Sequence, residues 1–269
     1  MDWVGLWDVH PHPTWVVSPA ALQILAILLV LMLSMWLAAR RGLDPKVMYW
    51  AGVCGIVGAL AGGQLWAGLS DFIIRGGVAP GWTGSRSVIG AFCGALLAGG
   101  AYIRWTGRSL PAHADAAVPA IALGYAVARL GCLLAGDDFG IPTAGAWGLR
   151  FGSPSEALAF QVGAGLIAPD ATLTLPVHPT QIYHALLGLT GFAALLRIKG
   201  AAPGMRLAAA LMMYGAGRFV IEFFRGDAIP IWGPLDINHF ASLVMLAVGI
   251  AIWRPQPQAA FATARGEHA

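Results

Sequence analysis

Charged residues are scarce in this sequence. Asp, Glu, Lys and Arg together make up 11% of the 269 residues, whereas hydrophobic residues make up 58%. Soluble domains carry about 25% charged residues, so the shortage of charge excludes an ordinary soluble domain. The composition instead indicates a chain that folds in a lipid bilayer.

Cysteine and the common catalytic motifs are also scarce or absent. The three cysteines, Cys54, Cys93 and Cys132, lie inside apolar runs without C-x-x-C spacing, which argues against a disulfide framework and a thiolate metal centre. There is no G-x-S-x-G elbow, Walker loop or H-E-x-x-H motif. His10 and His12 have no further ligands nearby in the sequence, so solvated surface is favoured over a metal site. We expect no metal.

Long apolar runs are what the sequence has in abundance. About 20 apolar residues cross the hydrocarbon core, and seven such runs lie at about 20–39, 47–69, 87–105, 116–135, 180–196, 205–224 and 237–253. The continuous Leu, Ala and Ile between Ala21 and Ala39 do not alternate as barrel strands would. The pattern predicts an all-α polytopic membrane protein with seven transmembrane helices.

Lysine and arginine are distributed unevenly around these runs. If the N-terminus lies outside, the outer segments hold only Arg75, Arg86, Arg150 and Arg225. The inner loops then hold ten of the sixteen basic residues, namely Arg40, Arg41, Lys46, Arg104, Arg108, Arg197, Lys199, Arg206, Arg254 and Arg265. The positive-inside rule therefore predicts an outer N-terminus and a cytoplasmic C-terminus. Because the positive charge flanks the spans, it does not indicate nucleic-acid binding.

The remaining segments suggest a simple domain organisation. Residues 1–19 are expected to form an outer N-terminal segment, because no positively charged region precedes the first apolar run. Residues 20–254 form the seven-helix domain, in which a stretch at about 136–177, rich in Gly, Pro, Asp and Thr, is expected to form an outer arm. Residues 255–269 are expected to be a disordered cytoplasmic tail.

Ionisable side chains occur within the apolar runs. Arg218, Glu222 and Arg225 are spaced i, i+4 and i+7, so they share one helical stripe, and Arg129 lies in another run. Such side chains cost about 2.5–3.5 kcal/mol each at membrane depth, so they usually mark a working site. A guanidinium group is a planar fork suited to phosphate, which points to a phospholipid head group.

A purely structural interpretation stays open beside the functional one. The arginines could simply pair with Glu222, Asp227 or Asp236, or extend to the interface, as Arg225 could from a helix end. Likewise His178-Pro-Thr-Gln-Ile-Tyr183-His184 begins a run with Pro179 in a first-turn position. A network of hydrogen bonds at a helix start explains these polar residues as well as catalysis does.

Three segments carry a family resemblance. They are His178-Pro-Thr-Gln-Ile-Tyr183, Tyr214-Gly-x-x-Arg218-Phe-x-x-Glu222-Phe-Phe-Arg225 and Ala128-Arg129-Leu-Gly131-x-x-x-x-Gly136-Asp137-x-x-Gly140. Together they resemble the phosphatidylglycerol–prolipoprotein diacylglyceryl transferases of bacterial inner membranes. The seven spans with an outer N-terminus also match that family.

The resemblance implies a reaction. A diacylglyceryl group passes from phosphatidylglycerol to the lipobox cysteine thiol of a preprolipoprotein, with release of glycerol 1-phosphate and without a metal or redox cofactor. Arg218 and Arg129 would hold the phosphate and offset the charge that develops as the C–O bond breaks, and Glu222 would fix Arg218. The residues expected to bind substrate are Glu222, Arg225, Cys132, Gly136, Asp137, Gly140, His178, Gln181, Tyr183 and Tyr214.

The sequence departs from the family pattern at several positions. Ile89 stands where the family has a histidine, Cys132 and Ala135 replace asparagines, and a glutamate is shortened to Asp137. His184 follows Tyr183 where the family has glutamate, and it is our candidate for the base that deprotonates the acceptor thiol, with His178 as an alternative. The apolar helix behind His184 and the arginines near it would favour its neutral, proton-accepting form.

Three functions stay open at this stage. The first is an active diacylglyceryl transferase. The second, favoured by the departures, is a paralogue of the same fold that binds phospholipid or modifies a different acceptor. The third is a transporter, which is disfavoured because the sequence has no evident internal repeat or matching pair of broken helices.

Overall fold

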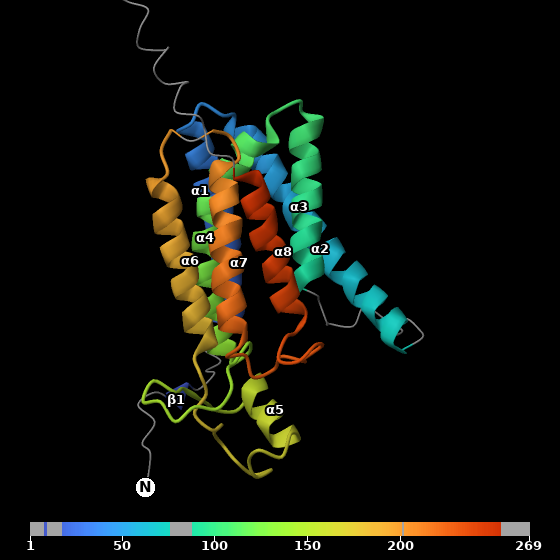
Figure 1. Cartoon of the computed structure of the whole chain (residues 1–269), viewed down its shortest axis with the longest axis vertical. Helices are drawn as coiled ribbons and strands as arrows, with labels where there is room; N and C mark the ends of the chain where they lie inside the picture. The colour runs from blue at the N-terminus through green and yellow to red at the C-terminus, as the bar shows by residue number, and fades with distance from the viewer. Residues whose placement is uncertain (1–7, 10–17, 76–87, 201, 254–269) are drawn as a thin grey trace, which may run out of the picture. The chain divides into compact units, whose positions relative to one another are not determined.

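The structure, a computed structural model, describes residues 8–9, 18–75, 88–200 and 202–253. This part of the chain is mostly α-helical, with two very short strands (Figure 1). The helices are α1 (Pro19–Ala39), α2 (Pro45–Arg75), α3 (Val88–Trp105), α4 (Leu110–Ala135), α5 (Glu156–Gly163), α6 (Thr180–Arg197), α7 (Met205–Glu222) and α8 (Ile237–Ile252). The strands are β1 (Asp8–Val9) and β2 (Arg150–Phe151).

Each of the seven predicted runs coincides with a helix, so the helical class is confirmed. Three segments among the described residues are long and apolar enough to cross a membrane, namely Pro19–Ala39, Pro45–Trp66 and Leu110–Ala135. Ile237–Ile252 is a shorter apolar helix. The count of seven spans therefore stays a prediction. Most of the expected N-terminal segment and the expected tail lie outside the described residues.

The chain divides into two compact units, and the smaller one comprises residues 28–120. Its helices α2 and α3 pack backbone against backbone through glycines. A Cβ atom at Gly94 would overlap the carbonyl oxygen of Gly58, and one at Gly62 would lie 2.9 Å from the Gly94 Cα. Small residues at such positions are what allow membrane helices to approach closely.

The larger unit comprises residues 1–27 and 121–269. In it α7 packs against both α6 and α8 (Figure 1). Glycine again permits close approach, because a Cβ atom at Gly215 would lie 2.7 Å from the Ser242 carbonyl oxygen in α8. A Cβ atom at Gly188 of α6 would lie 2.7 Å from the Ala122 carbonyl oxygen in α4. These helices hold the polar residues of the predicted site.

The arm between α4 and α6 is folded. Its hydrophobic core consists of Phe139, Leu149, Phe151, Ala157 and Val177, and β1 pairs in parallel with β2. Figure 1 shows the arm at the end of the helices where α4 ends and α6 begins.

Two backbone hydrogen bonds join the arm to its neighbours. The Ile141 amide donates to the Phe224 carbonyl at 2.9 Å, just after α7, and the His178 amide donates to the Ile141 carbonyl at 3.0 Å. The arm is therefore tied to the end of α7, which carries Arg218, and to the start of α6.

Candidate functional site

Two of the predicted site arginines share one carboxylate. Arg129 projects from α4 and Arg225 follows α7, and their Nη1 atoms pair with opposite oxygens of Asp138. Arg225 also forms a bidentate ion pair with Asp227, in which Nε donates to Oδ1 at 2.8 Å and Nη2 donates to Oδ2 at 2.6 Å. The structure thus brings Arg129 and Arg225 together around Asp138, a residue that the sequence analysis did not single out.

Asp138 is held ionised by its surroundings. Burial alone would raise the pKa of Asp138, but the guanidinium groups of Arg129 and Arg225 lower this pKa to about 2. Its backbone has a φ of 53°, a left-handed conformation that Asp tolerates better than most residues. This turn places the carboxylate between the two arginines.

Arg218 has a different set of partners. Its Nη2 lies 3.5 Å from Glu222 Oε2, and its Nη1 donates to the Tyr214 hydroxyl at 3.1 Å. Glu222 is almost fully buried and accepts a hydrogen bond from Asn238 Nδ2 at 2.9 Å. The expected pairing of Arg218 with Glu222 is therefore present. Because its ion pair is long, the Arg218 guanidinium is less neutralised than those of Arg129 and Arg225.

An aromatic pair lies between the arginines. The Arg129 guanidinium carbon lies 4.9 Å from the centre of the Tyr125 ring, and the Tyr125 and Tyr214 rings meet edge to face at 5.3 Å. Tyr125 Oη lies 2.9 Å from His184 Nδ1. Tyr125 thus connects Arg129, Tyr214 and His184, although the sequence had not singled it out.

His184 itself is completely buried, with an exposed fraction of 0%. Its Nε2 has no hydrogen-bond partner among the described residues, and its Nδ1 faces Tyr125. The ring of His184 is therefore closed off from the surface, which disfavours direct contact with an acceptor thiol.

The start of α6 supports the turn that follows α4. Gln181 Nε2 donates to the Asp137 carbonyl at 2.6 Å, and the Thr180 hydroxyl donates to the Asp138 carbonyl at 2.5 Å. His178 Nδ1 lies 3.0 Å from the Tyr183 hydroxyl, and burial lowers the pKa of His178, so its ring is neutral at pH 7. These contacts match the structural interpretation of this motif, a hydrogen-bonded helix start that positions the site.

The two predicted site glycines are required by geometry. Gly136 ends α4 with a φ of 67°, where glycine avoids the strain of a side chain. At Gly140, a Cβ atom would lie 2.6 Å from His178 Cβ and 2.8 Å from the Phe224 carbonyl oxygen. Gly140 thus permits the close contact of the arm with both α6 and the end of α7.

Gly140→Ala should destabilise the protein, because the added methyl group meets backbone on one side and His178 on the other. Over-packing of this kind typically costs about 1–3 kcal/mol, measurable by thermal unfolding in detergent. Gly163→Ala is the matched control, since a Cβ atom there has no neighbour within 4 Å. Equal unfolding temperatures for the two variants would contradict the close contact.

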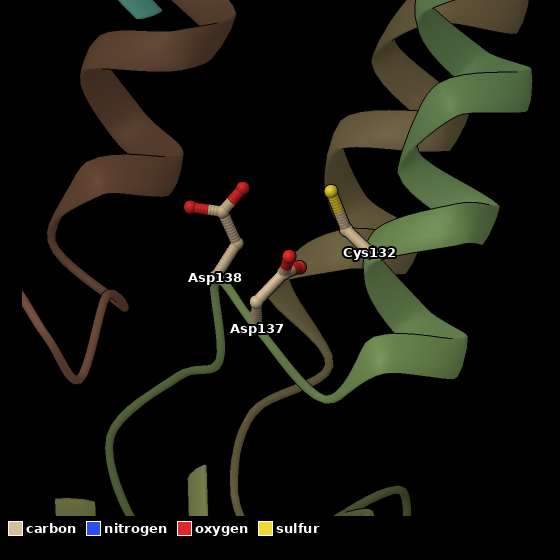
Figure 2. Close-up of side chains that lie close together, drawn as sticks. All are labelled: Cys132, Asp137 and Asp138. Carbon is tan, nitrogen blue, oxygen red and sulfur yellow. The ribbon is translucent and has the colours of Figure 1, made fainter. Parts of the chain in front are cut away.

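Cys132, Asp137 and Asp138 form a cluster that could be taken for a metal site (Figure 2). One ligand atom from each lies within 4.8 Å of the others. However, Asp138 already pairs with two guanidinium groups, whose positive charge opposes a cation there. The arrangement favours an anion over a metal ion nearby.

The fold and the site define a helical membrane protein with arginines converging where its helices meet a folded arm. The chain belongs to the prolipoprotein diacylglyceryl transferase family, because that family's model matches residues 16–254. The resemblance seen in the sequence is therefore confirmed over most of the chain.

Alignments with individual relatives extend over most of this chain and over most of the relative's own length. A phosphatidylglycerol–prolipoprotein diacylglyceryl transferase of Leifsonia xyli is 30% identical, over 92% of this chain and 80% of the relative. The enzyme of that name from Gloeobacter violaceus is 31% identical, over 82% of each chain. The one from Clostridium tetani is 26% identical, over 87% of this chain and 90% of the relative.

Proposed function

We propose that this chain transfers the sn-1,2-diacylglyceryl group of phosphatidylglycerol to the lipobox cysteine thiol of a preprolipoprotein. The observation that carries the proposal is the convergence of Arg129 and Arg218 on the Tyr125–Tyr214 pair, one over a ring and one at a hydroxyl. Two guanidinium groups set at one place suit a phosphodiester. Because the chain belongs to the transferase family, we take phosphatidylglycerol to be the anion that these arginines bind.

In the proposed reaction, the sulfur of the acceptor thiol attacks the carbon of the diacylglyceryl group that carries the phosphate, and the thiol proton ends on the phosphate of the departing glycerol 1-phosphate. A C–S bond forms, the C–O bond breaks, and its electron pair leaves with glycerol 1-phosphate. Arg218 and Arg129 offset the negative charge that develops on the leaving group, an effect commonly worth about 3–4 kcal/mol per well-placed donor. No metal or redox cofactor is required for this exchange.

The proposed setting is the bacterial inner membrane, with the N-terminus outside and the C-terminus in the cytoplasm. The apolar helices and the family support a membrane location, and the distribution of lysine and arginine supports the orientation. The partners are then phosphatidylglycerol in the surrounding lipid and the lipobox segment of a preprolipoprotein.

A paralogue that keeps the lipid site without this reaction is the second candidate, and Ile89 favours it. Ile89 lies in the first turn of α3, and its side chain is outside the described part of the structure. The resemblance places a histidine at this position, so an acceptor base is missing from its family location.

One assay separates the two candidates. Purified protein supplied with phosphatidylglycerol and a lipobox peptide should form the thioether product, detected by mass, and release an equal amount of glycerol 1-phosphate. Ile89→His should raise the rate or leave it unchanged, since a positioned base is worth about 10²–10⁴-fold. Activity that appears only in Ile89→His would establish the paralogue, and a peptide whose cysteine is replaced by serine serves as the control.

A further inference from the structure

We propose that His184 is a positioning residue, which ends a directed chain of hydrogen bonds running from Arg218 through Tyr214 and Tyr125. The chain fixes the orientation in which Arg218 meets its anionic ligand. The identity of that ligand as a lipid phosphate rests on the proposed function, whereas the chain itself rests on contacts within one unit of the structure.

The chain has three links. Arg218 Nη1 donates to the Tyr214 hydroxyl at 3.1 Å. The Tyr214 and Tyr125 rings meet edge to face with their centres 5.3 Å apart, and the proposed middle link is a hydrogen bond between their hydroxyl groups. Tyr125 Oη lies 2.9 Å from His184 Nδ1. Side chains from α7, α4 and α6 are thereby joined in sequence.

The direction of the chain follows from counting donors. A guanidinium group can only donate, so the Tyr214 oxygen must accept from Arg218. If Tyr214 then donates to Tyr125 and Tyr125 donates to His184 Nδ1, both hydroxyl hydrogens are used. The only polar position of this chain of bonds that then lacks a partner among the described residues is the Nε2–H of His184. In the reverse direction two positions lack one, the Tyr214 hydrogen and the Nε2 lone pair of His184. Because each unmade hydrogen bond costs free energy, we infer that Nδ1 accepts and that the ring hydrogen is on Nε2.

Burial argues against His184 as the base. The His184 side chain has an exposed fraction of 0%. The Arg129 guanidinium lies over the ring of Tyr125, whose hydroxyl is the hydrogen-bond partner of His184. A proton added to His184 would create a further buried positive charge beside these groups, which is costly without a paired anion. A neutral His184 is instead well suited to accept the final hydrogen bond.

The consequence falls on Arg218. Its ion pair with Glu222 is long, at 3.5 Å, so the Tyr214 hydroxyl supplies much of the constraint on its guanidinium plane. Tyr214 in turn is held by Tyr125, whose hydroxyl is held by His184. Loss of the acceptor at the end frees a tyrosine hydroxyl to rotate and loosens the arginine that contacts the ligand.

The test uses two substitutions of one residue in the full-length protein. His184→Asn places an acceptor oxygen near the Nδ1 position but cannot act as a base, and His184→Leu removes the acceptor. If His184 positions Arg218, kcat for diacylglyceryl transfer should fall about 10²-fold in His184→Leu, as for a small misplacement of a catalytic group. His184→Asn should recover kcat to within about fivefold of wild type.

Further readouts distinguish positioning from general damage. The KM for the lipobox peptide should stay unchanged in His184→Leu, because Arg218 acts on the lipid. His113→Leu, which removes another buried histidine, bonded through Nδ1 to the Ser109 carbonyl, should keep the wild-type rate per folded protein. Loss of activity in His184→Asn equal to that in His184→Leu would overturn the proposal and favour the base.

The hydrogen-bond direction is measurable without any activity. Nitrogen NMR of histidine-labelled protein, with the His184 signal assigned by its absence in His184→Asn, reports which ring nitrogen carries the hydrogen. We expect the Nε2–H form. The Nδ1–H form would overturn the chain even in an active enzyme. Failure of the wild type to modify the peptide, combined with the Nε2–H form, would refute the proposed function and leave the hydrogen-bond chain intact.

Discussion

Arg218→Ala is expected to lower the rate of diacylglyceryl transfer by about 10²–10³-fold, the usual effect of removing one donor that stabilises charge in the transition state. Arg218 is the least neutralised of the three site arginines, because its only ion pair among the described residues is the 3.5 Å contact with Glu222. Its charge is therefore the most available to a phosphate. The measurement is glycerol 1-phosphate release by purified protein, normalised to the folded fraction.

Arg218→Lys should rescue poorly. The lysine keeps the charge but not the planar fork that can bind phosphate while donating to Tyr214. Arg206→Ala is the matched control on the same helix, since Arg206 Nε donates to the Ile198 carbonyl at 2.9 Å and should be dispensable for turnover. Full activity in Arg218→Ala would favour the structural interpretation, in which this arginine serves only to pair with Glu222.

The helices of this protein were predictable because a bilayer leaves few alternatives. A long apolar run must form its hydrogen bonds internally, so each predicted run became a helix, although α2 ends and α4 begins six residues beyond the run predicted for it. The run expected at 205–224, for example, ends as α7 at Glu222. The short helix α5 was missed because it lies in a Gly- and Pro-rich stretch. Its start is capped by Ser155, but a helix of only eight residues is too short to show a clear helical pattern in the sequence.

Site contacts were predictable only when they were local. The pairing of Arg218 with Glu222 follows from i, i+4 spacing on one helix. The role of Asp138 does not, because it depends on a left-handed turn and on an arginine 87 residues away in sequence, Arg225. The Tyr125–His184 contact likewise joins residues 59 positions apart. Tertiary packing decides such contacts, and a single sequence carries little information about it.

Asp138→Asn is expected to destabilise the protein by about 3 kcal/mol at neutral pH, since breaking a buried ion pair leaves a charge without its partner. Arg129 would lose the carboxylate that it shares, whereas Arg225 would keep Asp227. For a chain of this size the unfolding temperature should fall by roughly 10 °C. Thermal unfolding in detergent, followed by circular dichroism, measures this.

The pH dependence identifies the carboxylate responsible. The pKa of Asp138 is lowered from 3.8 to about 2, so its stabilising effect is fully present above pH 4 and is lost as the pH falls toward 2. The wild type should therefore lose about 2 kcal/mol over this range that Asp138→Asn does not lose. Asp137→Asn is the control of opposite sign, because burial raises the pKa of Asp137 and its ionised form does not stabilise the fold. If Asp137→Asn destabilised the protein as much as Asp138→Asn, general disruption of the turn would explain both results. That outcome would contradict a specific stabilisation by the carboxylate that Arg129 and Arg225 share.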